Sequence, residues 1–335
     1  MNETPRESIQ RIVSTINAHQ RFLVATHIRP DGDAVGSVLG MTTMLQKLGK
    51  GAHAYCQDPP PPTQDFLFGV REMVHDGIRV SDYEVVVLVD CGDLDRVGDA
   101  LASQLSQVGL LVNIDHHISS KPFGDIYWVE AGASSTCEMI YELSQAIPLK
   151  LDASIAAQLY TGILMDTGSF RFANTTSRAL EVAAALVDAG AQPGFIAEQV
   201  YDSFSPNRLQ LLAEVLGSLE YHADQRVVTG TITPDMYIRT ATSYSDSDSF
   251  ITYLRSVKTV QVAILFRQES DGIVYTSLRS KGEADVASFA ERYGGGGHRR
   301  AAALRVRGDF DKMKKQITDA MLQYLEVGGD LQPSG

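Results

Sequence analysis

Three apolar runs of the sequence are each followed by residues of the types that bind divalent metals, histidine and aspartate. Residues 22–26 precede His27, Asp31 and Asp33, residues 85–89 precede Asp90, and residues 110–114 precede Asp115, His116 and His117. Each run has the length and the continuous apolar character of a strand covered on both faces. Because ligands of an open α/β sheet lie outside the carboxyl ends of its strands, we expect the three clusters to converge in one crevice. The sequence therefore predicts a site for two divalent metal ions.

A further carboxylate, Asp166, lies in an apolar helical pattern over residues 152–168. An unpaired carboxylate is costly to bury, and a metal ion is the partner that the other clusters suggest. Two ions about 3.5 to 4 Å apart need a bridging ligand and terminal nitrogen and oxygen ligands from several segments. Mixed imidazole and carboxylate ligands favour two Mn²⁺ ions, with Mg²⁺ or Co²⁺ as substitutes, over a thiolate-bound metal.

Each of these clusters also has a structural interpretation. Asp33 could cap a helix while Asp31 occupies a turn, since acidic residues are common in both places. Asp90 could simply end a strand, and His116 and His117 could be structural histidines. The metal site is favoured because all the required ligand types occur together.

A glycine segment predicts a second site in the C-terminal part of the chain. Gly294, Gly295, Gly296 and Gly297 precede His298, without the Gly-Lys-Ser/Thr ending of a phosphate-binding Walker loop. The glycines would let backbone N–H groups approach an anion, although a flexible turn is the alternative. Arg299, Arg300 and Arg279, the last at the end of an expected strand over 273–278, favour a phosphate or nucleotide contact. Arg279 could also be a solvated surface residue.

The elements that position these residues predict two domains of different class. Strands and helices alternate up to about residue 115, which is typical of βαβ units, and helical patterns follow at 134–146, 152–168 and 176–190. Strands at 227–232, 260–266 and 273–278 and helices at 283–292 and 309–325 predict a smaller α+β domain. We expect an α/β metal-binding catalytic domain at 1–190, with a parallel sheet and helices on both faces, a helical linker at 191–222 and a substrate-binding α+β domain at 223–330.

Composition limits the partners of the protein. The 335 residues, 44% hydrophobic and 21% charged, are typical of a globular protein in water. A formal charge of -12 argues against long nucleic acid, including long duplex DNA, because such binding needs a broad basic surface. No apolar run is long enough to span a bilayer, so we expect a cytoplasmic protein without a membrane partner. Cys56, Cys91 and Cys137 are too widely spaced to predict a disulfide framework or a structural zinc site.

Together these motifs resemble the DHH phosphoesterase superfamily, within it the DHH/DHHA1 branch of nanoRNases and 3'-phosphoadenosine 5'-phosphate (pAp) phosphatases. The segment from His27 to Asp33 resembles the first motif, Asp90 the second, Asp115-His116-His117 the motif that gives the family its name, and Asp166-Thr167-Gly168 the fourth. The segment from Arg279 through His298 to Ala302 resembles the DHHA1 signature. Ala303 departs from the pattern, which usually has glycine there.

The resemblance implies a role for each of these residues. His27, Asp31 and Asp90 would hold one Mn²⁺, and Asp33, Asp90, His116 and Asp166 the other, so that Asp90 bridges the two ions. Asp115 and His117 would be catalytic, with Asp115 orienting an imidazole and His117 facing the scissile phosphate. Arg279, Gly295, Gly296, Gly297 and His298 would bind the terminal phosphate or nucleotide of the substrate.

The predicted activity is Mn²⁺-dependent hydrolysis of short oligoribonucleotides, of pAp to AMP and phosphate, or of both, by two-metal activation of water. A cyclic-dinucleotide or linear dinucleotide phosphodiesterase is the alternative. An inorganic pyrophosphatase is less favoured because of the glycine-His298 segment, and a non-catalytic nucleotide-binding regulator because every proposed ligand is present. The expected partners are short RNA oligonucleotides or small nucleotides, and a homodimer is left open.

Overall fold

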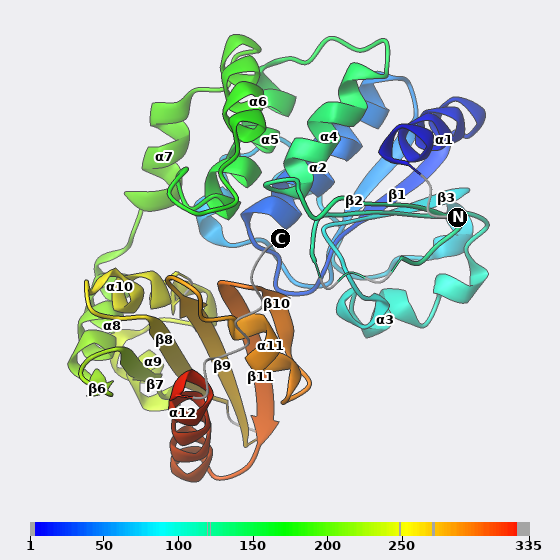
Figure 1. The fold of residues 1–335 in the computed structure, drawn as a ribbon. Helices are drawn as coiled ribbons and strands as arrows, with labels where there is room; N and C mark the ends of the chain where they lie inside the picture. Colours follow the sequence, from blue (N-terminus) through cyan, green and yellow to red (C-terminus); the bar gives the residue numbers. More distant parts are fainter. Residues whose placement is uncertain (1–3, 119, 121, 248, 270–271, 327–335) are drawn as a thin grey trace. The chain divides into compact units, whose positions relative to one another are not determined.

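A sheet of five parallel strands organises the N-terminal part of the protein in this computed structural model (Figure 1). Its strands are β1 (Arg21–Ala25), β2 (Gly51–Tyr55), β3 (Val85–Val89), β4 (Leu111–Asp115) and β5 (Ile126–Val129). They lie in the order β2-β1-β3-β4-β5, so the three apolar runs noted in the sequence form adjacent strands. The strand order reverses between β1 and β3, which is the kind of switch point where open α/β sheets bind ligands. The predicted parallel sheet is confirmed.

The structure describes residues 4–326 except 119, 121, 248, 270 and 271. The chain divides into two compact units, Met1–Ser203 and Phe204–Gly335. The division falls within the segment 191–222 that was expected to link two domains, where the described helices are α7 (Pro193–Tyr201) and α8 (Pro206–Gly217). Residues 327–330, the expected end of the second domain, lie outside the described residues. Each unit has its own sheet and its own hydrophobic clusters.

Both faces of the first sheet are covered, which explains why its strands are continuously apolar. Phe22 and Val24 of β1 pack on one face of the sheet. The helices on this face are α1 (Pro5–Ala18), α2 (Gly32–Lys47), α4 (Thr136–Gln145) and α5 (Ala153–Asp166). Helix α6 (Ser177–Asp188) packs on α5. Leu23 and Ala25 face the other side, where the short helix α3 (Asp99–Ala102) and several 3-10 turns cover them. Figure 1 shows α1, α2 and α4 on one side of the sheet and α3 on the other. The expectation of helices on both faces is confirmed.

The expected alternation of strand and helix is wrong between β2 and β3. Helix α2 connects β1 and β2 as predicted, but the described residues between β2 and β3 contain only the 3-10 turns η1 (Pro62–Gln64), η2 (Val70–Glu72) and η3 (Val80–Asp82). Four consecutive prolines, residues 59–62, begin this connection. Proline has no N–H to donate and clashes with the preceding helical turn, so a regular helix cannot continue through such a run. Two further 3-10 turns, η4 (Leu94–Arg96) and η5 (Leu105–Gln107), lie between β3 and β4.

The second unit is built on a mixed sheet in the order β10-β11-β9-β8-β7-β6. The strands are β6 (Glu220–His222), β7 (Val227–Ile232), β8 (Val262–Gln268), β9 (Ile273–Ser280), β10 (Gly296–His298) and β11 (Ala301–Arg307). Its helices besides α8 are α9 (Pro234–Thr240), α10 (Ile251–Ser256), α11 (Val286–Glu291) and α12 (Phe310–Glu326), and η6 (Tyr244–Ser247) is a 3-10 turn. The predicted α+β architecture is confirmed, although the sequence patterns had not identified β6, β10, β11, α9 or α10.

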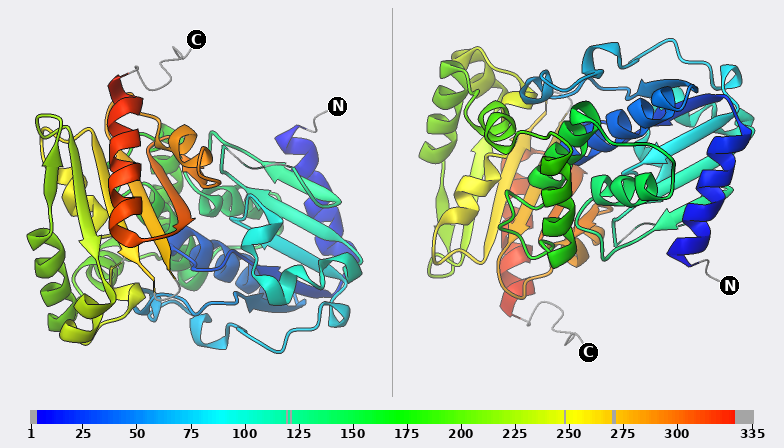
Figure 2. Two further views of the ribbon diagram at one scale, coloured as in Figure 1. Left: turned by 90° about the horizontal axis from the view of Figure 1, so that it is seen from below. Right: turned by 90° about the horizontal axis from the view of Figure 1, so that it is seen from above.

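Two clusters of apolar side chains lie on opposite faces of this second sheet. Phe266 and Leu278 pack against α11 and α12 on one face, and Ala263 and Leu265 pack against α8 and α10 on the other. Figure 2 shows α12, in red, lying across the strands. Within the described part of the chain, every helix is too short or too polar to cross a bilayer.

The contact between α2 and α5 generates a stability prediction at Gly36. A Cβ added there would lie 2.5 Å from the carbonyl oxygen of Gln158 and 2.9 Å from Sγ of Cys137. Because the backbone oxygen cannot rotate away, Gly36→Ala is expected to lower the free energy of unfolding by roughly 1–3 kcal/mol. Denaturant unfolding of the metal-free protein, followed by circular dichroism, measures this change.

Gly194→Ala in α7 is the matched control for Gly36→Ala. A Cβ at Gly194 meets no atom within 4 Å, so the free energy of unfolding should change by less than about 1 kcal/mol. Equal stability of the wild type and Gly36→Ala would contradict the close approach of α2 to α5.

Candidate functional site

The carboxyl ends of β1, β3 and β4 bring the predicted metal ligands together around Asp90. Nε2 of His27 lies 3.5 Å from Oδ2 of Asp90, and Nε2 of His116 lies 3.6 Å from Oδ1 of Asp90. His116 Nε2 is also 3.6 Å from Oδ2 of Asp33 and 3.8 Å from Oδ2 of Asp166. Ligand atoms of His27, Asp31 and Asp90 lie within 4.8 Å of one another, and so do those of Asp33, Asp90 and His116. Asp90 is therefore common to two potential metal-binding groups.

The two imidazoles are oriented with Nε2 toward the carboxylates. Nδ1 of His27 lies 2.8 Å from the carbonyl oxygen of Ile28, and Nδ1 of His116 lies 3.3 Å from that of Ala133. A carbonyl oxygen only accepts hydrogen bonds, so each Nδ1 carries the N–H and each Nε2 of the neutral ring presents a lone pair. This is the usual arrangement of a histidine that binds a metal through Nε2.

The neutral ring of His27 places a hydrogen-bond acceptor opposite Asp90. Burial and the charge of Arg96 lower the pKa of His27 to about 4, so its ring is neutral at pH 7. Its Nε2 lone pair and the Asp90 carboxylate are then two acceptors facing each other, which requires a proton or a metal cation between them. For His116, burial lowers the pKa, but the carboxylates of Asp166 and Asp33 outweigh burial and raise it overall. The buried carboxylate oxygens and imidazole nitrogens of this cluster are ligand types that fit a divalent cation such as Mn²⁺.

Asp90 occupies the centre of this arrangement under two constraints. Its backbone has a φ of 54°, in the left-handed region that residues other than glycine seldom adopt. The residue is only 1% exposed. Burial and the neighbouring carboxylates, Asp33 first among them, raise the pKa of Asp90 well above its ordinary value. Strained backbone and a displaced pKa at the end of a strand are typical of functional positions.

Asp33 is held by the start of helix α4, a contact that the sequence analysis missed. The backbone N–H of Thr136 donates to Oδ2 of Asp33 at 2.6 Å, and that of Cys137 donates to Oδ1 at 2.9 Å. The first N–H groups of a helix have no partner inside the helix and favour a negative charge.

The alternative in which Asp33 caps α2 is wrong, because Asp31 is the capping residue and accepts from the N–H groups of Asp33 and Ala34 at 3.1 Å.

The segment 133–137, which we call the α4 entry segment, contacts most of the cluster. Besides the bonds to Asp33 and the Ala133 carbonyl beside His116, the hydroxyl of Thr136 donates to Oδ1 of Asp90 at 3.2 Å. The local signal for this segment is the pattern Ser135-Thr136-Cys137-Glu138, in which Ser135 caps α4 by accepting from the N–H of Glu138. That pattern predicts where a helix starts, but not which distant carboxylate the helix binds.

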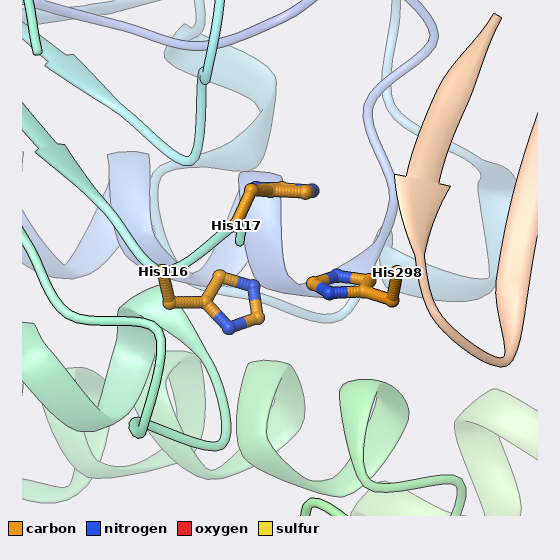
Figure 3. Close-up of side chains that lie close together, drawn as sticks. All are labelled: His116, His117 and His298. Carbon is orange, nitrogen blue, oxygen red and sulfur yellow. The ribbon is translucent and has the colours of Figure 1, made fainter. Parts of the chain in front are cut away.

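Asp115 and His117 form a separate pair beside Asp90. Nδ1 of His117 donates to Oδ1 of Asp115 at 2.7 Å and lies 3.6 Å from Oδ1 of Asp90. Burial raises the pKa of Asp115, but the hydrogen bond from His117 together with the nearby charges of His117 and His116 lowers it overall. Asp115 therefore remains ionised and fixes the ring of His117 at the end of β4, where Figure 3 shows His116 and His117.

In the second unit, the structure places Arg279 and His298 in one row of the sheet. Arg279 of β9 is opposite Ala301 of β11, and Ala301 is opposite His298 of β10. Residues directly opposite each other in neighbouring strands project on the same face, so Arg279 and His298 flank a small alanine on that face. Figure 3 shows the His298 side chain on β10.

The expected glycine loop is in part a strand. Gly296 and Gly297 belong to β10 and pair with Ala303 and Ala302 of β11. A Cβ at Gly295 or Gly297 would collide with backbone atoms of β11, so these glycines permit close strand approach. The N–H groups of Gly294 and Gly295 already donate to carbonyls at the end of α11, which leaves fewer N–H groups for an anion than the sequence had suggested.

Comparisons with known proteins agree with this arrangement. The sequence model of the DHH family, N-terminal domain, matches residues 21–163, and that of the DHHA1 domain matches residues 226–326. A bifunctional oligoribonuclease and PAP phosphatase of Thermus thermophilus is 32% identical over 92% of this chain and 91% of its own length. The crystal structure of an exopolyphosphatase-related protein from Bacteroides fragilis has a TM-score of 0.88 at 23% identity, over 96% of this chain and 97% of that one. RecJ of Thermus thermophilus in complex with Mn²⁺ has a TM-score of 0.54 at 12% identity, over 95% of this chain and 55% of RecJ.

The raised pKa of Asp90 predicts an unusual effect of removing its charge. In the folded protein Asp90 keeps its proton to a higher pH than in the unfolded chain, so its contribution to stability is present at low pH and is lost as pH rises. In the presence of EDTA at pH 7.5, Asp90→Asn should therefore raise the free energy of unfolding by more than about 1 kcal/mol. The difference from the wild type should shrink as pH falls toward 4.

Denaturant unfolding at several pH values measures this difference. Addition of Mn²⁺ is the control, because binding to the folded wild type should then reverse the order of stability. An Asp90→Asn protein less stable than the wild type at every pH in EDTA would contradict the crowding of carboxylates around Asp90.

Proposed function

Because the chain belongs to the DHH phosphoesterase family and has a DHHA1 domain after its DHH domain, we propose that it hydrolyses short oligoribonucleotides and pAp. The observation that carries the proposal is the cluster around Asp90, where buried carboxylates and imidazole nitrogens face one another. A protein retains such a cluster at a cost in stability, and a metal-dependent reaction is the reason that fits the donor set. The two activities in the name of the Thermus relative support this choice of substrates.

Two Mn²⁺ ions would be held by residues of the first unit. His27, Asp31 and Asp90 would bind one, and Asp33, Asp90, His116 and Asp166 the other, so that Asp90 bridges both. When bound, the ions would offset charge on phosphoryl oxygens and make a water molecule more acidic. The Mn²⁺ in the RecJ structure supports this choice of metal, and Mg²⁺ or Co²⁺ are the expected substitutes.

The residues of the chain then have distinct tasks in the proposed reaction. Asp115 fixes His117 through Nδ1, and Nε2 is the ring atom that would face a phosphate oxygen of the substrate. The α4 entry segment and the carbonyl of Ile28 hold the ligands in place before substrate arrives, so little reorganisation is needed during the reaction.

The second unit would recognise the end of a short substrate. Arg279 and His298 lie two strands apart, about 10 Å between their backbones, and both can reach a phosphate above Ala301. Together, Arg279 and His298 would bind one terminal phosphate or nucleotide; we call this pair the phosphate clamp. The net charge of -12 supports small substrates rather than long nucleic acid. A cytoplasmic location is part of this proposal.

A panel of substrates tests the proposal. We expect the Mn²⁺-loaded protein to release AMP from the dinucleotide pApA and phosphate from pAp, with chromatography of the products as the measurement. Cyclic di-AMP and pyrophosphate should react much more slowly under the same conditions. Asp90→Ala is the control for contaminating enzymes and should lose activity on every substrate. Preferential turnover of pyrophosphate or of the cyclic dinucleotide would contradict the proposed substrate class.

The proposed phosphate clamp predicts a selective defect in Arg279→Ala. Loss of one charge-assisted hydrogen bond should raise KM for pApA by roughly 10- to 100-fold. Mn²⁺ content, measured by atomic emission, should stay at the wild-type level, because Arg279 lies in the other unit from the proposed ligands. Arg239→Ala is the matched control, since Arg239 forms an exposed ion pair with Glu214 between α9 and α8. A KM equal to that of the wild type in Arg279→Ala would remove this residue from the substrate site.

A further inference from the structure

Asn174 makes an unusual set of contacts beside the cluster around Asp90. Its side-chain amide nitrogen lies 3.3 Å from Oδ2 of Asp166, 3.2 Å from the carbonyl oxygen of Asp166 and 2.9 Å from the carbonyl oxygen of Ser134. All three atoms are acceptors, so this one NH₂ group serves a carboxylate and two backbone oxygens. Ser134 belongs to the α4 entry segment, so Asn174 joins Asp166 to the segment that also holds Asp33 and Asp90.

Asp166 needs such a donor because of its place in the fold. It is the last residue of α5, where the helix dipole presents partial negative charge and disfavours a carboxylate. The carboxylates of Asp33 and Asp90 lie close by, since all three groups approach Nε2 of His116 within 3.8 Å. A neutral amide donor stabilises the ionised Asp166 without occupying a position that a cation would need.

The loop after α5 turns back on itself, so that Asn174 lies beside Asp166. Gly168, Ser169 and Phe170 have successive φ values of 57°, 61° and 59°. For residues other than glycine this conformation costs roughly 1–2 kcal/mol each, so it persists only where surrounding contacts require it. The hydroxyl of Thr167 accepts from the N–H of Phe170 at 3.1 Å and donates to the carbonyl of Ile163, which fixes the turn.

We propose that Asn174 is a positioning residue that holds the Asp166 carboxylate for the metal ion proposed to lie among Asp33, Asp90 and His116. The inference rests on the proposed function, because it assigns Asp166 to that ion. Asn174 touches neither substrate nor the reacting atoms; it acts through Asp166 and through the carbonyl of Ser134. The amide of Asn174 contacts Asp166 and Ser134 directly, whereas it reaches Asp90 only through the α4 entry segment. Its removal should therefore weaken the ion at Asp166 much more than the ion at His27 and Asp31.

Titration of the metal-free full-length protein with MnCl₂ tests this inference. Calorimetry should give two Mn²⁺ per wild-type chain, and electron paramagnetic resonance should show coupling between the two ions. In Asn174→Ala the affinity for one ion should fall by roughly 10- to 100-fold, the usual effect of losing a partner of a metal ligand. The affinity for the other ion should change much less, and the coupled signal should be lost at Mn²⁺ concentrations that saturate the wild type.

A second variant separates hydrogen bonding from packing. Asn174→Asp keeps the size of the side chain but places an oxygen against the three acceptor atoms. If the amide acts as a donor, Asn174→Asp should bind the affected ion at least as weakly as Asn174→Ala. If the side chain only fills space, Asn174→Asp should bind Mn²⁺ like the wild type, and that result would overturn the inference.

Thr175→Val is the matched control for changes to the loop. The Thr175 hydroxyl is buried without a hydrogen-bond partner among the described residues, so its removal should leave both Mn²⁺ affinities at the wild-type value. Equal Mn²⁺ binding by the wild type and both Asn174 variants overturns the role of Asn174 alone. A wild type that binds no Mn²⁺ and hydrolyses neither pApA nor pAp would overturn the proposed function itself.

Discussion

Repulsion among buried carboxylates is the constraint on which the first unit depends. Asp33, Asp90 and Asp115 are each at most 2% exposed, and Asp166 joins them at the edge of the same cluster. Charges of one sign at such distances in a medium of low polarity are strongly unfavourable, so the metal-free protein keeps extra protons there. Cations bound in place of these protons would be attracted by the same carboxylates that repel one another in the metal-free protein. For this reason we interpret the cluster as a metal site.

The fold meets this constraint by bringing different kinds of polar group to one edge of the sheet. The switch point between β1 and β3 brings together the strand ends, and the start of α4 adds N–H groups that offset the charge of Asp33. Backbone carbonyls next to His27 and His116 decide which ring nitrogen faces the carboxylates. Among the described residues, the ligands grouped around Asp90 come from the first unit, whereas Arg279, Ala301 and His298 share one row of the second sheet. Under the proposed function, the first unit would bind the metal ions and the second would recognise the substrate.

The sequence predicted the parts of the structure that follow from local pattern and parallel-sheet geometry. Apolar runs placed β1, β3 and β4, and the rule for strand ends then gathered their ligands in one place. The bond between Asp33 and Thr136 joins residues 103 positions apart, so no local pattern could predict it. The strand at Gly296 was missed for another reason: glycine is read locally as a breaker, whereas here its lack of a side chain allows β10 to approach β11.

Anomalous diffraction at the manganese absorption edge, from crystals soaked in MnCl₂, tests the central claim most directly. The account predicts two peaks on either side of the Asp90 carboxylate, one next to Nε2 of His27 and the other next to Nε2 of His116. An absence of anomalous density between these side chains, in crystals that diffract well and contain Mn²⁺ elsewhere, would contradict it.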